Sequence, residues 1–188
     1  MPRTPFTPAG RTHLMRVVLQ RVTRAEVRVD DRVVGRIDRG VVVLAGFQRD
    51  DAPEALTWMA DRILSLRLFP DAAGDHAVPA ADDPSASDRA ADPSVSERTR
   101  PSSFSRDIME VGGSLLVVSQ FTLYGDTRKG RRPSFSAAAT PDVAVPLYDR
   151  FVELLRERVP GRVETGEFGA IMAVELLNDG PVTLILER

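Results

Sequence analysis

The chain has 188 residues, of which 43% are hydrophobic and 28% are charged, and its formal net charge at pH 7 is −2. This length and composition fit one globular domain with a single buried core. The sequence contains no cysteine, which excludes disulfide bonds, thiolate metal sites and a cysteine nucleophile.

Histidine is almost absent. His13 lies in a leader rich in proline, threonine and arginine, and His76 lies in a tract of alanine, aspartate, proline and serine. A Ser-His-Asp hydrolase, a histidine-ligated zinc site and a histidine general base each need an imidazole on a rigid scaffold. We therefore expect chemistry without histidine, without a metal and without a cofactor.

The N-terminal residues do not resemble a targeting signal. They are rich in proline and lack the apolar core of a signal peptide, and no run approaches the roughly 18 apolar residues of a membrane span. We expect a soluble, cytoplasmic protein with no membrane contact. Residues 1–14 are predicted to be a disordered leader, and residues 15–188 a single domain that begins at Met15.

The first part of the domain is predicted to be rich in strands. Apolar and β-branched residues alternate with polar ones, and Asp30-Asp31 is typical of a tight turn. The predicted strands are residues 15–22 (MRVVLQRV), 25–29 (AEVRV), 32–37 (RVVGRI) and the buried run 40–47 (GVVVLAGF).

A helix follows, with Asp50 or Asp51 as its cap and Pro53 at its first position, and it is predicted to end near Leu68. Its apolar residues at helical spacing are Leu56, Met59, Ile63 and Leu66. Residues 71–103 then contain almost no large apolar side chain, so they cannot bury enough surface to offset their ordering entropy. We predict a disordered insertion there.

Beyond the insertion, residues 112–124 (GGSLLVVSQFTLY) read as a strand. A second helix is predicted from Pro141, with Thr140 as its cap. Its predicted buried stripe consists of Ala144, Tyr148, Phe151, Val152 and Leu155.

The chain ends with two apolar runs, residues 170–177 (AIMAVELL) and 182–187 (VTLILE), which are predicted to be strands. Asn178-Asp179-Gly180 between them reads as a hairpin turn. Pro181 follows directly, although proline cannot donate a backbone hydrogen bond to a sheet.

Two segments have residues suited to chemistry. Four cations in five residues, at Arg128, Lys129, Arg131 and Arg132, suit a phosphate backbone, although a solvated surface loop would look the same. Residues 119–123 (SQFTL) supply hydroxyl, amide and backbone N–H groups to a small ester or carbonyl compound. Taken in isolation, that second segment is better explained as a strand with polar residues at alternate positions.

Residues 15–22, 119–139 (SQFTLYGDTRKGRRPSFSAAA) and 178–186 (NDGPVTLIL) together resemble the D-aminoacyl-tRNA deacylase family. The resemblance spans about residues 15–70 and 104–187. It implies hydrolysis of the ester bond of D-aminoacyl-tRNA and mischarged glycyl-tRNA, with rejection of L-aminoacyl-tRNA. The implied fold is α/β of the α+β type: a mainly antiparallel, barrel-like sheet with two packed helices, paired as a homodimer.

The resemblance also implies roles for single residues. Gly180-Pro181 would adopt a cis peptide and reach across the homodimer into the partner's active site, where its carbonyl groups select the D configuration. Arg21 would hold this Gly-Pro loop, and Phe168 with Met172 would line the adenosine pocket. For Arg21 a surface salt bridge is the alternative, and for Phe168 and Met172 it is a place in the core.

In the same way, Ser119, Gln120, Phe121 and Thr122 would surround the scissile ester. Backbone N–H groups near Gln120 and Phe121 would stabilise the oxyanion, which is usually the largest contribution in acyl transfer. Thr122 is either a nucleophile or a positioning group, and without a histidine to deprotonate it a threonine hydroxyl is a poor nucleophile. We favour hydrolysis assisted by the vicinal ribose hydroxyl of the substrate.

Three alternatives remain open. A tRNA-binding module without catalysis would keep the basic loop but has no need of the SQFTL segment. A structural β-protein would dimerise through its last hairpin. A relative that edits L-alanyl-tRNA would have a trans Gly-Pro peptide.

Overall fold

The computed structural model describes residues 15–71 and 104–188. The predicted leader and nearly all of the predicted insertion lie outside the described residues. The elements in chain order are β1 (Arg16–Val29), β2 (Arg32–Ile37), β3 (Gly40–Gly46), α1 (Pro53–Ser65), β4 (Ser114–Ser119), the 3₁₀ helix η3 (Phe121–Tyr124), α2 (Pro141–Arg158), β5 (Val163–Thr165) and β6 (Ala173–Glu187).

Strand β1 organises the sheet. One edge of β1 pairs with β6, and the other edge pairs first with β3 and then with β2, all three antiparallel. The pairs β3–β4 and β4–β5 are parallel. The sheet is therefore mixed, but three of the five pairs among the described strands are antiparallel, as the expectation of a mainly antiparallel sheet requires.

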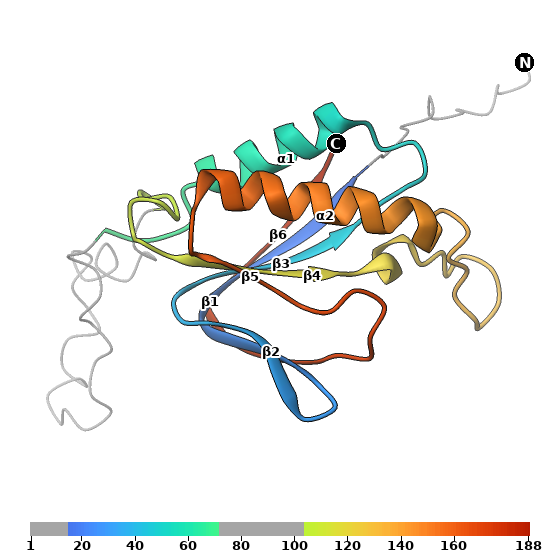
Figure 1. Ribbon diagram of the computed structural model, residues 1–188, viewed down its shortest axis with the longest axis horizontal. Helices are drawn as coiled ribbons and strands as arrows, with labels where there is room; N and C mark the ends of the chain where they lie inside the picture. The colour runs from blue at the N-terminus through green and yellow to red at the C-terminus, as the bar shows by residue number, and fades with distance from the viewer. Residues whose placement is uncertain (1–14, 72–103) are drawn as a thin grey trace, which may run out of the picture.

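Both faces of the central strands are buried. The helices α1 and α2 lie side by side over one face of the sheet (Figure 1), where Val41, Val43 and Leu115 join the main core. On the other face Val42 and Leu116 belong to a second buried cluster, with Val27 of β1. Strands buried on both faces carry uninterrupted apolar runs, which explains the sequences of β3 and β4.

The second cluster is enclosed because the sheet curls on itself into a nearly closed barrel. Gly35 of β2 lies so near β5 that a Cβ atom at this position would be 2.4 Å from the Thr165 carbonyl oxygen. The two strands at the ends of the β2-β1-β3-β4-β5 order therefore approach each other through a glycine.

The helices differ from the predictions only at their ends. The N-cap of α1 is Ala52, because the Asp51 side chain instead accepts the Gln48 N–H at 2.9 Å, and α1 ends at Ser65 rather than near Leu68. Thr140 is the N-cap of α2 but makes no side-chain capping bond. The five residues of the predicted α2 stripe are all buried, as expected. No helix within the described residues is long and apolar enough to cross a membrane.

The two predicted N-terminal strands are one strand. Thr23 and Arg24 are exposed, which interrupts the apolar alternation, yet β1 continues through them and Arg24 pairs with Leu177 of β6. The separation predicted at Thr23 is therefore wrong, because a register shift changes the burial pattern without ending the pairing.

The predicted C-terminal hairpin is also wrong. Asn178 pairs with Val22 and Thr183 pairs with Gln20, so both flanks of the supposed turn pair with β1 in the same direction. Four residues, 179–182, therefore lie opposite the single residue Arg21 as a wide bulge. A proline is tolerated in this bulge because no ladder hydrogen bond requires its missing N–H.

We predict that Gly35→Ala lowers the free energy of unfolding by about 1–3 kcal/mol, because the added methyl group collides with the Thr165 carbonyl. Urea denaturation measures the change. The control is Val33→Ala on the same strand, where a partly exposed side chain should cost less than about 1 kcal/mol. Equal losses in the two variants would contradict the close approach of β2 and β5.

Candidate active site

The segment Ser119–Thr122 leaves the sheet at the end of β4. Ser119 still pairs with Ala45 of β3, and the Gln120 N–H donates to the Ala45 carbonyl at 2.7 Å. The chain then turns into η3, so the strand predicted to reach Tyr124 ends at Ser119. This turn brings the polar residues of the segment to the rim of the sheet.

The turn also decides which backbone donors are available. The Gln120 N–H is already bonded to Ala45, so it is not an oxyanion donor in this arrangement. The first N–H groups of a helix have no partner within it. Those of Phe121 and Thr122, at the start of η3, have no backbone partner among the described residues. The oxyanion hypothesis is thereby narrowed to these two groups.

Thr122 has no base beside it in the described part of the chain. Its hydroxyl accepts a hydrogen bond from the Gln120 side-chain amide, and both histidines lie outside the described residues. Burial raises the pKa of Asp51 to about 6, but this carboxyl group is bonded to Gln48 and does not line the hollows beside Ser119. Thr122 is therefore poorly placed for deprotonation.

Two hollows share the wall formed by Ser119, Gln120, Phe121 and Gly169. One, of about 70 Å³, is lined by apolar side chains including Phe168. The other, of about 230 Å³, is lined by Met172 among others. The structure thus brings Phe168 and Met172 to the SQFT segment from two sides rather than into one hollow.

A cluster around Arg16, which the sequence did not reveal, contacts η3 at Leu123 and Tyr124. The Arg16 Nη1 group donates to the Leu123 carbonyl at 2.5 Å, and its Nε lies 2.6 Å from the Glu187 carboxylate. The Arg16 guanidinium also stacks over the Tyr124 ring at 5.3 Å, and the Tyr124 hydroxyl donates to the Gly46 carbonyl at 3.2 Å. The pairing of Arg16 with Gly46 on one side and with Glu187 on the other brings these residues together.

Arg21 holds the bulge of β6. Its side chain is only 9% exposed; its Nε lies 3.0 Å from the Asp179 carboxylate and donates to the Asp179 carbonyl at 3.3 Å. Its Nη1 donates to the Leu68 carbonyl, and the guanidinium lies over the Phe69 ring. Arg21 is therefore a buried, multiply bonded residue rather than a partner in a surface salt bridge.

The bulge requires a glycine. Gly180 has φ of +112°, and a Cβ atom there would be 3.1 Å from Arg21 Nη2. The Gly180–Pro181 peptide is cis, as the resemblance implies, whereas the alternative that edits L-alanyl-tRNA requires a trans peptide. Both residues are exposed.

A short bridge lies next to the Leu68 carbonyl that Arg21 bonds. Phe69 and Arg106 form an isolated antiparallel bridge with two N–H···O bonds of 3.0 Å. This bridge joins the chain segments on either side of residues 72–103. The carbonyl of Leu68, which Arg21 bonds, lies immediately before the bridge.

Within the chain the bulge and the SQFT segment are separate. The bulge lies opposite Arg21, whereas Ser119 is level with Ala45, which pairs with Val17 on β1. Neither Gly180 nor Pro181 lines either hollow at Ser119.

The predicted basic loop is closed by a bridge between Asp126 and Ser134 and is fully exposed at its tip. Arg128 binds Asp126 through two side-chain hydrogen bonds, of 2.9 and 2.6 Å, and lowers the pKa of that carboxyl group to about 2. No ion pair joins Lys129, Arg131 or Arg132 to another described residue.

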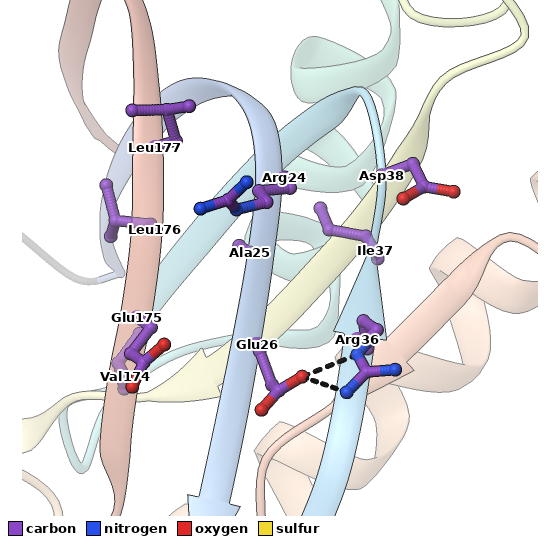
Figure 2. Close-up of a pocket in the computed structure, with 10 residues that line it drawn as sticks. All are labelled: Arg24, Ala25, Glu26, Arg36, Ile37, Asp38, Val174, Glu175, Leu176 and Leu177. Atoms are coloured by element: carbon purple, nitrogen blue, oxygen red, sulfur yellow. Dashed lines mark hydrogen bonds and ion pairs between the residues drawn. The ribbon is translucent and has the colours of Figure 1, made fainter.

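A further hollow of about 550 Å³ lies over β1, β2 and β6 (Figure 2). On its wall Glu26 binds Arg36, and Arg36 lowers the pKa of Glu26. It offers no donor set of the kind found at Phe121 and Thr122. In the described parts of the chain, no three His, Cys, Asp or Glu side chains are placed to hold a metal ion.

Comparison with known proteins gives a consistent result. A family model described as D-Tyr-tRNA(Tyr) deacylase matches residues 18–85 and 76–187. The chain is 46% identical over 173 residues to the D-aminoacyl-tRNA deacylase of Kosmotoga olearia, covering 92% of this chain and 97% of that protein. It is 48% identical over 174 residues to the D-aminoacyl-tRNA deacylase of Cyanothece sp., with 93% and 92% covered.

Solved structures share the fold. One described as c-Myc DNA Unwinding Element Binding Protein superposes with a TM-score of 0.74 at 34% identity, covering 92% of this chain and 98% of that one. Another, of a probable eukaryotic D-amino acid tRNA deacylase, has a TM-score of 0.67 at 24% identity, covering 93% and 99%. The fold is thus that of a deacylase with a mixed, nearly closed barrel and two helices. The chain belongs to the D-Tyr-tRNA(Tyr) deacylase family.

Proposed function

We propose that the chain hydrolyses the ester bond of D-aminoacyl-tRNA at the two hollows beside Ser119–Phe121. The family membership makes the chain a D-aminoacyl-tRNA deacylase, an ester hydrolase. The placement of the reaction rests on the turn at η3. After this turn the N–H groups of Phe121 and Thr122 have no backbone partner among the described residues, and Phe121 lines both hollows.

The proposed mechanism needs no ionised protein side chain. An aminoacyl ester of ribose is already activated, so positioning it beside a water molecule supplies much of the rate. Water adds to the ester carbonyl, and the oxyanion accepts hydrogen bonds from the Phe121 and Thr122 N–H groups. The tetrahedral intermediate then collapses, the ribose oxygen leaves with a proton relayed by the vicinal hydroxyl, and the free D-amino acid and tRNA are released.

Thr122 has a positioning role in this mechanism. Its hydroxyl accepts a bond from the Gln120 amide, which orients the Gln120 side chain at the rim of both hollows. Ser119, at the end of β4, contributes a hydroxyl to the same wall. Phe168 and Met172 bound the site and would pack on the terminal adenosine.

Selection of the D configuration is assigned to the bulge of β6. Gly180 and Pro181 are exposed and held by Arg21, so their carbonyl groups are available to a neighbouring molecule. Carbonyl groups placed against the substrate's α-carbon would accept bonds from its ammonium group and leave no room for an L side chain. Rejection by a clash is sharper than selection by added attraction. Glycine, which has no side chain, would pass.

A homodimer would bring the bulge to the hollows. In the described structure β6 pairs only with β1, and its apolar side chains include Leu177 and Ile185, 50% and 67% exposed. Val174 lines the hollow at Ser119, three residues before Leu177, and Gly180 lies three residues after it. A two-fold axis at Leu177 would therefore set the partner's bulge against this hollow, and an isologous interface would complete two identical sites.

The tRNA would extend over the basic loop. Arg128, Lys129, Arg131 and Arg132 are exposed next to η3, and such contacts to phosphates are electrostatic and weaken with salt. A tRNA-binding module without catalysis would use the loop alone. The unpaired donors at Phe121 and Thr122 favour the enzyme.

The direct test is a deacylation assay with D-tyrosyl-tRNA, glycyl-tRNA and L-tyrosyl-tRNA. We expect rapid release of D-tyrosine and glycine and no release of L-tyrosine above the uncatalysed rate. Tight binding of all three substrates without hydrolysis would support the module instead.

We predict that Thr122→Val keeps kcat within about tenfold of the unchanged protein, because a positioning hydroxyl contributes less than an oxyanion donor, whose removal costs about 10²–10³-fold. Single-turnover hydrolysis of D-tyrosyl-tRNA measures the effect, with Thr57→Val on the exposed face of α1 as the control. Complete loss of turnover in a folded Thr122 variant would restore the nucleophile hypothesis.

We predict that Leu177→Arg gives a monomer, because a two-fold axis at this position would bring two arginines together, and that the monomer loses deacylase activity. Light scattering after size exclusion measures the assembly. Val33→Arg makes the same change at a partly exposed valine on β2 and should remain dimeric and active. A fully active monomer would rule out a site completed by the partner.

A further inference from the structure

A fourth hollow, of about 660 Å³, is lined by Tyr124 at the end of η3, whereas the ester site is lined by Phe121 at its start. It is bounded by the start of β1, the end of η3 and the basic loop. Its lining carries two guanidinium groups, from Arg16 and Arg128, and the hydroxyl groups of Thr127, Ser134 and Ser136. Tyr124 also lines the hollow, but its hydroxyl group donates to the Gly46 carbonyl. Guanidinium and hydroxyl groups are the usual donors to phosphate oxygens.

The charge around this hollow is positive on balance. Arg128 is paired with Asp126 at an exposed position, where an ion pair contributes little and a phosphate competes readily, whereas Arg16 is paired with Glu187 at a partly buried position. The basic loop between the lining residues Arg128 and Ser134 adds Lys129, Arg131 and Arg132. Counted with Arg16 and Arg128, five cations stand against the carboxylates of Asp126 and Glu187 with which the two lining arginines pair.

An exposed aromatic pair connects this hollow to the ester site. Phe121 and Phe135 meet edge to face with centroids 5.2 Å apart, and they are 57% and 37% exposed. Phe121 lines both hollows of the ester site. Phe135 packs over Gly125, where a Cβ atom would be 3.1 Å from its ring, and Gly125 lines the fourth hollow. Exposed aromatic rings beside a cationic groove are the features that bind single-stranded nucleic acid.

The substrate itself contains a group that would fill the fourth hollow. A tRNA whose terminal adenosine is esterified at Ser119–Thr122 continues through the 5′ phosphate of that adenosine into the unpaired cytidine before it. We propose that the hollow between Arg16, Arg128 and Ser134 binds this phosphodiester, and that Phe135 stacks on the preceding base. The inference rests on the proposed function, because it takes the position of the ester from it.

The consequence is a dependence on substrate length. The D-tyrosyl esters of adenosine and of the dinucleotide CpA have the same reacting group, and they differ only in the part that the fourth hollow would bind. We expect kcat/KM to be about tenfold or more higher for the CpA ester, and this gain to shrink as salt rises, because a phosphate contact releases counterions. A base stacked on an aromatic ring accounts for a gain of this size.

Two variants separate the contributions, and the ratio of kcat/KM for the two esters cancels any change in the ester site. Phe135→Leu should lower this ratio about fivefold or more, and Arg128→Gln should lower it and flatten its salt dependence. Arg150→Gln removes the same charge from the exposed face of α2 and should leave the ratio unchanged. Calorimetric binding of unesterified adenosine and CpA gives the same comparison without chemistry.

The outcomes are distinct. Equal kcat/KM values for the two esters, or a ratio that Phe135→Leu and Arg128→Gln leave unchanged, would overturn the nucleotide site while the deacylase function stands. Failure to hydrolyse any D-ester, including D-tyrosyl-tRNA, would overturn the proposed function. In that case tighter binding of CpA than of adenosine, lost in Phe135→Leu, still supports the nucleotide site, and equal binding overturns it.

Discussion

The buried guanidinium of Arg21 is the interaction on which the arrangement depends. It lies on β1 and bonds the bulge of β6 at Asp179 and the carbonyl of Leu68, so three segments distant in sequence meet at one side chain. A buried charge without partners costs several kcal/mol, which makes these contacts mutually dependent. Because Arg21 is fixed in a continuous strand, the exposed Gly180 and Pro181 are presented from a rigid base rather than from a free loop.

The overall elements could be predicted because local pattern and tertiary environment agree. The apolar runs of β3 and β4 are buried on both faces, and the stripe of α2 faces the core as its spacing indicates. The SQFTL segment is a candidate site because hydroxyl and amide groups stand at the end of an apolar run, but its assignment to the ester rests on the family resemblance. Neither inference needed knowledge of distant contacts.

The wrong predictions share a physical cause: the local sequence of a segment does not specify which strand it will pair with. Asn178-Asp179-Gly180 has the composition of a hairpin turn, and only the shared partner β1 makes it a bulge. The sequence suggests the Gln120 N–H as an oxyanion donor, but the Ala45 carbonyl of another strand accepts its hydrogen bond. The pair of Arg16 and Glu187 cannot be predicted from local pattern, because the two residues are separated by almost the whole domain and meet only through the β1–β6 register.

The bridge between Phe69 and Arg106 makes the fold modular at one point. Its two hydrogen bonds lie immediately after the Leu68 carbonyl that Arg21 bonds. They hold Phe69 and Arg106 together, whatever the length of the chain between these two residues. The entropy of closing such a connection grows only logarithmically with its length. This position can therefore accept a longer segment or a whole inserted domain, such as a fluorescent reporter, while the geometry of the bulge is preserved.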